Sequence, residues 1–127
     1  MFSHVMIGMN DLDASKSFYD ALLGSLGIKP GKVDAKGRVM YAGNGGLFML
    51  TKPIDGSPAT GANGGTIGFA CTSEAEVDAW HAAGVAAGGT ACEDPPGLRV
   101  ADFGKLYLAY LRDPAGNKLC GLFRPEQ

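Results

Sequence analysis

The feature that most constrains the fold is a repeated order of predicted elements: one strand, one helix and three further strands. In the first half, residues 2–9 alternate as a strand, an apolar stripe after the predicted N-cap Asp13 indicates a helix, and strands flank the turn signal Asn44-Gly45. In the second half, residues 66–72 predict a strand and the capping box that begins at Ser73 predicts a helix. The first strands of the two halves are offset by about 62 residues, which indicates an internal repeat.

Neither half is long enough to bury its own sheet, so we expect the two halves to pair. The prediction is a single α+β domain over residues 1–127, with one module at about 1–51, a loop at 52–65 rich in Gly, Pro, Ser and Thr, and a second module at about 66–124. Each module would have the strand–helix–three-strand order. The modules would form curved mixed sheets around a cavity, with the helices outside.

Turn chemistry fixes the register of two hairpins. Asn44-Gly45 is typical of a two-residue turn, and residues 113–117 (Asp-Pro-Ala-Gly-Asn) form the loop between two apolar runs. This spacing predicts three cross-strand pairs: Met40 with Met49, Tyr110 with Cys120, and Arg112 with Lys118.

Alternation of side chains along the strands then predicts one wall of the cavity. It is mostly apolar with a few polar groups, which is typical of a small-molecule site. A loop at Glu93–Lys105 would cover the cavity as a lid, with Gly97 and Gly104 as hinges. The predicted wall consists of His4, Met6, Arg38, Met40, Met49, Thr66, Gly68, Leu108, Tyr110 and Cys120.

Composition excludes several classes of function. The net charge is −2 and no run of Lys or Arg is present, so nucleic-acid binding is not expected. No stretch approaches the roughly 18 apolar residues of a membrane span. Three cysteines without paired spacing, and no apolar N-terminal signal, predict a cytoplasmic protein with free thiols.

Several motifs together resemble the vicinal oxygen chelate superfamily, which includes glyoxalase I, fosfomycin- and bleomycin-resistance proteins and extradiol dioxygenases. The similarity extends over essentially the whole chain and implies a fold and a pocket rather than a reaction. It also implies a homodimer, because relatives commonly pair modules across two chains. The motifs are His4-Val5, Asn10 to Asp13, Phe18-Tyr19, Leu26-Gly27, Ile67 to Phe69 and Asp113 to Lys118.

The resemblance further implies four ligands for a divalent metal, two in each half. Mapped onto this sequence, the ligand positions hold His4, Met49, Thr66 and Cys120. Only His4 is a ligand of the family's type, and no Asp, Glu or His lies within one residue of Met49 or Thr66. We therefore expect no bound cofactor and no divalent metal at His4.

The chemistry of the cavity leaves several interpretations open. One is a protein that binds a small, partly apolar molecule with an acidic or carbonyl group, which Arg38 or Arg112 would meet at the mouth of the cavity. A second is a thiol enzyme with His4 and Cys120 as catalytic residues. A third is a Cu(I) site of His4, Met49 and Cys120. A fourth is a lactoylglutathione-lyase-like or dioxygenase-like metalloenzyme with unrecognised ligands, so whether the chain is an enzyme stays open at this point.

Overall fold

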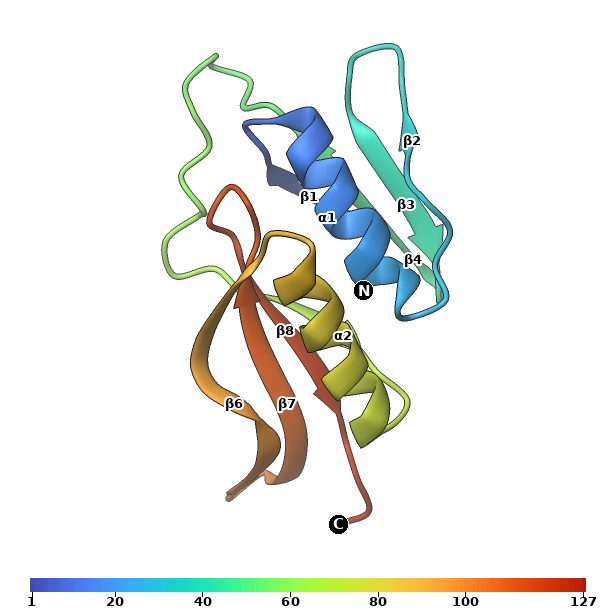
Figure 1. Cartoon of the computed structure of the whole chain (residues 1–127), viewed down its shortest axis with the longest axis vertical. Coiled ribbons are helices and arrows are strands. Elements are labelled where there is room, and N and C mark those ends of the chain that lie inside the picture. The colour runs from blue at the N-terminus through green and yellow to red at the C-terminus, as the bar shows by residue number, and fades with distance from the viewer.

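The computed structural model describes all residues, 1–127, and shows two modules of the same order. In the first module the sheet order is β1-β4-β3-β2, and β1 runs parallel to β4 (Figure 1). Its elements are β1 (Val5–Gly8), α1 (Leu12–Gly24), β2 (Lys32–Val33), β3 (Val39–Gly43) and β4 (Gly46–Thr51).

The second module repeats this topology, with the sheet order β5-β8-β7-β6 and β5 parallel to β8. The predicted α+β class and the repeated module are therefore confirmed. The strands form two separate four-stranded sheets, each with parallel and antiparallel pairs, in agreement with the predicted mixed sheets. The elements are β5 (Ile67–Ala70), α2 (Glu74–Ala86), β6 (Thr90–Ala101), β7 (Gly104–Arg112) and β8 (Lys118–Phe123).

Side-chain caps define where the helices begin. The N-cap of α1 is Asp11, whose Oδ1 accepts a hydrogen bond from the N–H of Ala14, so the prediction of Asp13 as cap is wrong by two residues. The N-cap of α2 is Ser73, as the capping box predicts, and its Oγ accepts from the N–H of Glu76. Neither helix is long and apolar enough to cross a membrane.

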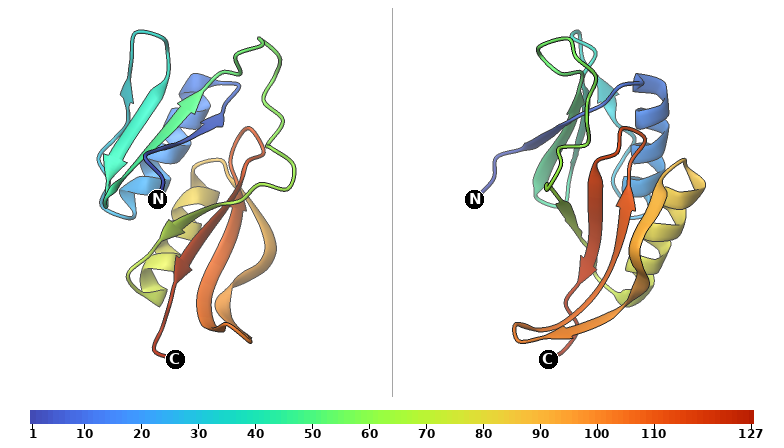
Figure 2. Two further views of the ribbon diagram at one scale, coloured as in Figure 1. Left: turned by 180° about the vertical axis from the view of Figure 1, so that it is seen from behind. Right: turned by 90° about the vertical axis from the view of Figure 1, so that its left-hand side faces the viewer.

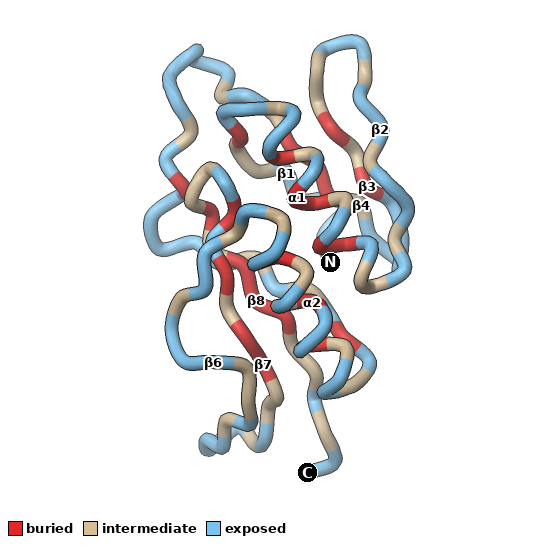
Figure 3. Tube along the Cα trace, viewed as in Figure 1, coloured by how far each residue is buried: buried red, intermediate tan, exposed pale blue.

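Both helices lie on one side of the two sheets and pack against each other, and the core lies between helices and sheets (Figures 2 and 3). We call the sheet face toward the helices the inner face and the opposite face the outer face. Gly121 on the inner face of β8 lies directly below Trp80, because a Cβ atom added there would come within 2.6 Å of the indole ring. The largest fully buried side chains include Trp80, Tyr19, Phe18, Leu22, Leu50, Leu111 and Leu119.

The hairpin registers agree with the predictions. Met40 pairs with Met49, Tyr110 with Cys120, and Arg112 with Lys118. At the first turn, Asn44 and Gly45 both have positive φ angles, 52° and 82°, as a type I′ turn requires.

The lid predicted at Glu93–Lys105 is wrong. Residues Thr90 to Ala101 form β6 and pair with β7, and the chain turns back at residues 102–103. The Pro-Pro-Gly sequence fits a strand here because β6 is the edge of its sheet and its register shifts between Cys92 and Gly97. Gly97 lies within this paired strand and therefore is no lid hinge.

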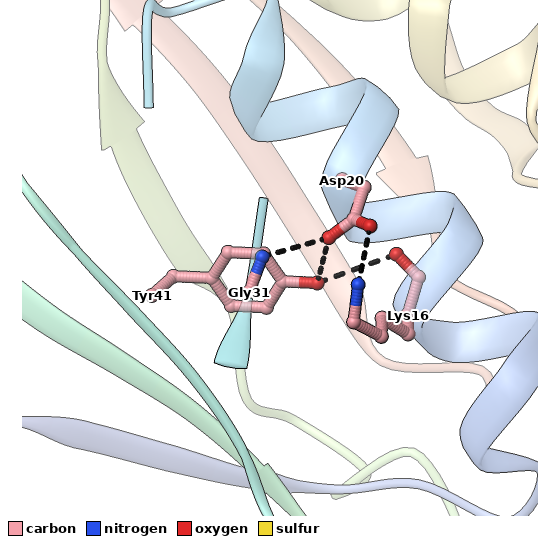
Figure 4. Close-up of polar contacts among 4 residues, drawn as sticks. All are labelled: Lys16, Asp20, Gly31 and Tyr41. Carbon is pink, nitrogen blue, oxygen red and sulfur yellow. Dashed lines mark hydrogen bonds and ion pairs between the residues drawn. The ribbon is translucent and has the colours of Figure 1, made fainter. Parts of the chain in front are cut away.

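A polar network anchors the edge of the first sheet to α1 (Figure 4). The carboxylate of Asp20 accepts hydrogen bonds from the Tyr41 hydroxyl at 2.8 Å and from the Gly31 N–H at 2.9 Å. It also forms an ion pair of 2.7 Å with Lys16. These contacts hold the segment before β2 against the helix.

Candidate functional site

The predicted cavity wall is divided between the outer faces of the two sheets. In the first sheet, Val39, Tyr41 and Leu50 belong to the core, so the alternating residues Met40 and Met49 lie on the outer face. Met6 joins them because it pairs with Met49. We call Met6, Met40 and Met49 the methionine cluster.

The second part of the wall lies on the other sheet. Ala109, Leu111 and Leu119 belong to the core, which places their neighbours along the strands on the outer face. We call Leu108, Tyr110 and Cys120 the aromatic cluster, and Gly68 lies beside it as the partner of Cys120 across the β5–β8 ladder. The side chains of this cluster therefore adjoin one another, as the sequence predicted.

In the single chain these clusters are open surfaces rather than the walls of the enclosed cavity that the sequence predicted. None of the four main pockets of the chain is lined by a residue of either cluster. The clusters are nevertheless well packed, since Met49, Leu108 and Cys120 are only 7%, 6% and 5% exposed. Gly68 and Met6, by contrast, are exposed.

His4 and Cys120 form no hydrogen bond with each other. His4 is exposed and precedes β1, and its Nδ1 lies 2.8 Å from the Ser3 hydroxyl. The Cys120 thiol donates instead to the carbonyl oxygen of Gly121, at 3.7 Å. Burial raises the pKa of the Cys120 thiol to about 11. A thiol that stays protonated at neutral pH is a poor nucleophile, which weighs against the interpretation as a thiol enzyme.

The side chain of Arg38 forms an ion pair with a neighbouring residue. Its Nε lies 2.7 Å from Oδ2 of Asp34, and its backbone N–H donates to the same carboxylate at 3.0 Å. The two residues close the turn between β2 and β3. The Arg38 guanidinium therefore stabilises this turn, and no contact orients it toward the methionine cluster or the aromatic cluster.

The residues at the family's ligand positions do not fit a divalent metal. No group of three or more His, Cys, Asp or Glu side chains is placed to hold a metal ion. Within each parallel strand pair, Met6 faces Met49 and Gly68 faces Cys120, so His4 and Thr66 occupy equivalent places two residues earlier. Thioether and hydroxyl groups at two of four positions leave no set of nitrogen and oxygen ligands for Zn²⁺, Ni²⁺ or Fe²⁺.

Thr66 lies in a polar pocket that the sequence did not predict. The pocket has a volume of about 240 Å³ and no hydrophobic lining, and it is formed by Gly61, residues 63–66, Arg112 and Lys118. Lys118 lies 4.7 Å above the centre of the Tyr110 ring, so the pocket adjoins the aromatic cluster. The glycines at 61, 64 and 65 were the only signal in the sequence, and only the folded chain brings the two cations to them.

A second pocket, of about 220 Å³, lies where the two modules meet. Its lining is mainly apolar and includes Val5, Phe48, Ile67 and Phe69. The only side chains there with a polar end, those of Tyr41 and Asn44, already donate to Asp20 and to the Leu26 carbonyl group. Apart from the exposed Asn44, this pocket therefore has no polar side chain that would orient a ligand.

Comparison with known proteins identifies relatives of the whole chain. The profile of the Glyoxalase/Bleomycin resistance protein/Dioxygenase superfamily matches residues 1–120. A glyoxalase/bleomycin resistance protein from Albidiferax ferrireducens T118 is similar in structure, with 60% sequence identity, a TM-score of 0.93 and coverage of 98% of this chain and 99% of that one. No curated protein matches the chain.

More distant structures share the fold alone. A glyoxalase-related enzyme from Fulvimarina pelagi has 23% identity and a TM-score of 0.73, with coverage of 98% of this chain and 89% of that one. A lactoylglutathione lyase from Agrobacterium tumefaciens has 23% identity and a TM-score of 0.67, with coverage of 96% and 92%.

Proposed function

Because this chain belongs to the Glyoxalase/Bleomycin resistance protein/Dioxygenase superfamily, we propose that it binds a small, partly apolar molecule on the outer face of its second sheet, without a divalent metal. The observation that carries the proposal is the order of the side chains along this face, from apolar at one end to positively charged at the other. Leu108 lies at one end, Tyr110 and Cys120 lie in the middle, and Arg112 and Lys118 lie at the other end of the same two strands. A ligand with an apolar body and one acidic group matches this order.

The donor set supports binding without metal chemistry. Three of the four residues at the ligand positions, Met49, Thr66 and Cys120, are not ligands of the family's type, and the Cys120 thiol is buried. The similarity to a lactoylglutathione lyase lies below 25% identity and concerns the fold, so we do not extend that activity to this chain. The three free cysteines suit a reducing compartment, which supports a cytoplasmic location as part of the proposal.

We propose further that a second copy of the chain closes the site. The outer face of the first sheet carries the methionine cluster, in which Met6 is 38% exposed beside the buried Met49, and an exposed apolar side chain of this kind suits contact with a second copy. The first sheet of a partner, laid over the second sheet of this chain, would turn the proposed site into a cavity. Light scattering at micromolar concentration should give the mass of a homodimer, and the mass of a monomer would contradict the assembly.

Thermal shifts with a ligand panel test the binding function. The panel contains aromatic and aliphatic carboxylic acids together with the corresponding amides. A ligand at 100 times its dissociation constant should stabilise the fold by about 2.7 kcal/mol. We expect the Tyr110→Ala variant to lose the shift, and the Val100→Ala variant, altered at an exposed position of β6, to keep it.

Two results would contradict the proposal. One is a panel in which no compound stabilises the protein. The other is a set of bound compounds whose shifts are the same in Tyr110→Ala and in the unaltered chain.

A further inference from the structure

We propose that the polar pocket formed by Gly61, residues 63–66, Arg112 and Lys118 binds an oxyanion, either the carboxylate or the phosphate group of a small ligand. The inference rests on the proposed function and deepens it, because it assigns the place of the ligand's acidic group. Three independent features of the pocket support it.

The first feature is an unbalanced pair of cations. Arg112 and Lys118 face each other across the β7–β8 ladder, where like charges repel. Lys118 forms an ion pair with Glu93, which compensates one of the two charges. The other nearby carboxylate, that of Asp113, is buried and accepts hydrogen bonds from Tyr19 and Asn117. One positive charge, that of Arg112, therefore lacks a carboxylate partner.

The second feature is the orientation of Arg112. Its Nη1 donates to the carbonyl oxygen of Gly116 at 2.8 Å, which fixes the guanidinium beside the β7–β8 turn. Its Nε and Nη2 have no partner within the chain. A guanidinium that is held at one nitrogen and free at the others is prepared to bind an oxyanion with two hydrogen bonds.

The third feature is the backbone of the loop at 61–66. Gly61, Ala62 and Gly64 have positive φ angles of 82°, 48° and 92°. The only backbone hydrogen bond inside the loop is donated by Gly65 to the carbonyl oxygen of Ala62, so the N–H groups of residues 62–64 have no acceptor in the chain. Successive N–H groups in such turns form concave sites for anions.

Close packing joins the loop to the cations. A Cβ atom at Gly61 would lie 2.7 Å from the carbonyl oxygen of Gly116, the same oxygen that accepts from Arg112. The loop and the guanidinium therefore both adjoin the carbonyl oxygen of Gly116. From this pocket the apolar body of a ligand would reach the Tyr110 ring below Lys118.

Titration of the ¹⁵N-labelled chain with inorganic phosphate, and separately with acetate, at constant ionic strength tests the site. We expect either anion to shift the amide signals of residues 62–66. Arg112→Gln should raise the dissociation constant about tenfold, since a charge-assisted hydrogen-bond pair is removed. Lys118→Gln should weaken binding in the same direction. Lys36→Gln removes an equal charge from the exposed turn before β3 and should leave binding unchanged.

Signals of residues 62–66 that do not move with either anion would overturn the assignment, as would equal weakening by Lys36→Gln and Arg112→Gln. A preference for acetate or for phosphate identifies the acidic group and supports the site. If aromatic ligands of the thermal-shift panel perturb Tyr110 while the anions leave the loop unchanged, the anion site fails and the proposed function stands. If the anions bind and no panel compound does, the proposed function fails instead.

Discussion

The hydroxyl group of Tyr19 lies 2.6 Å from Oδ2 of Asp113, although 94 positions separate the two residues in the sequence. Tyr19 belongs to α1 in the first module, and Asp113 begins the β7–β8 turn in the second. The same turn contributes Asn117, whose side chain donates to the carbonyl oxygen of Gly8 at 2.8 Å. Both hydrogen bonds cross between the modules, so this turn fixes their relative placement.

Tyr19→Phe should therefore weaken the contact between the two modules. The substitution keeps the ring and removes the only hydroxyl donor to Asp113, and we expect a loss of about 1.5–3 kcal/mol in the free energy of unfolding. Urea denaturation measures it. Tyr107→Phe is the matched control, because the Tyr107 hydroxyl donates to Asp78 at 2.8 Å in an exposed bond. The free energy of unfolding of Tyr107→Phe should fall by no more than about 0.5 kcal/mol. Equal losses in the two variants would contradict the role of Tyr19 in holding the modules together.

The contact of Gly121 with Trp80 predicts a second stability difference. A methyl group at this position would meet the buried indole at 2.6 Å, so Gly121→Ala should destabilise the fold by about 1–3 kcal/mol. Gly68→Ala adds a methyl group on β5, where no atom lies within 4 Å, and should be nearly neutral. Thermal unfolding of the two variants checks the prediction, and a Gly121→Ala variant as stable as the unaltered chain would contradict the packing described.

Stability should fall at alkaline pH. Burial raises the pKa of the Cys71 and Cys120 thiols from the ordinary 9.0 to about 11, so between these values the unfolded chain binds fewer protons than the folded one. The contribution of the two protonated thiols to the free energy of unfolding is therefore complete below pH 9. It is lost as the pH rises to about 11, by at most about 1.4 kcal/mol per thiol and pH unit. Burial also raises the pKa of Tyr19 well above 10.0, which adds to the loss above pH 10.

Urea unfolding as a function of pH, for the unaltered chain and the Cys120→Ala variant, measures this effect. Cys120→Ala should flatten the decline above about pH 9. An unchanged slope in Cys120→Ala would show that its thiol is not held protonated by the fold.

Local chemistry explains which parts of the structure could be predicted from the sequence. Asn44-Gly45 and the 113–117 loop each demand one turn geometry, so the register and the face of every residue in the two hairpins followed from them. Pro95 and Pro96 have the same appearance in a loop and in an edge strand, and only the position of β6 in its sheet distinguishes the two. Because of this ambiguity, a lid was predicted where the structure has a paired strand.

How the two modules are placed relative to each other could not be predicted from the sequence, for a different reason. Alternation tells which side of a strand a residue occupies, but it says nothing about how two sheets meet. The predicted pairs Met40 with Met49 and Tyr110 with Cys120 were therefore correct within each sheet, whereas the prediction of one enclosed cavity was not. The polar pocket was missed because Arg112, Lys118 and the loop at 61–66 come together only through tertiary contacts such as that of Gly61 with Gly116.

The central claim, a site that binds without a divalent metal, is tested most directly by titrating the metal-stripped protein with Zn²⁺ and Ni²⁺ in a calorimeter, alongside the double variant Met49→Glu/Thr66→His. The variant supplies a carboxylate and an imidazole at the two positions that now hold a thioether and a hydroxyl. The account predicts no binding by the unaltered chain and one metal per site in the variant. Stoichiometric binding of either metal by the unaltered chain would contradict it.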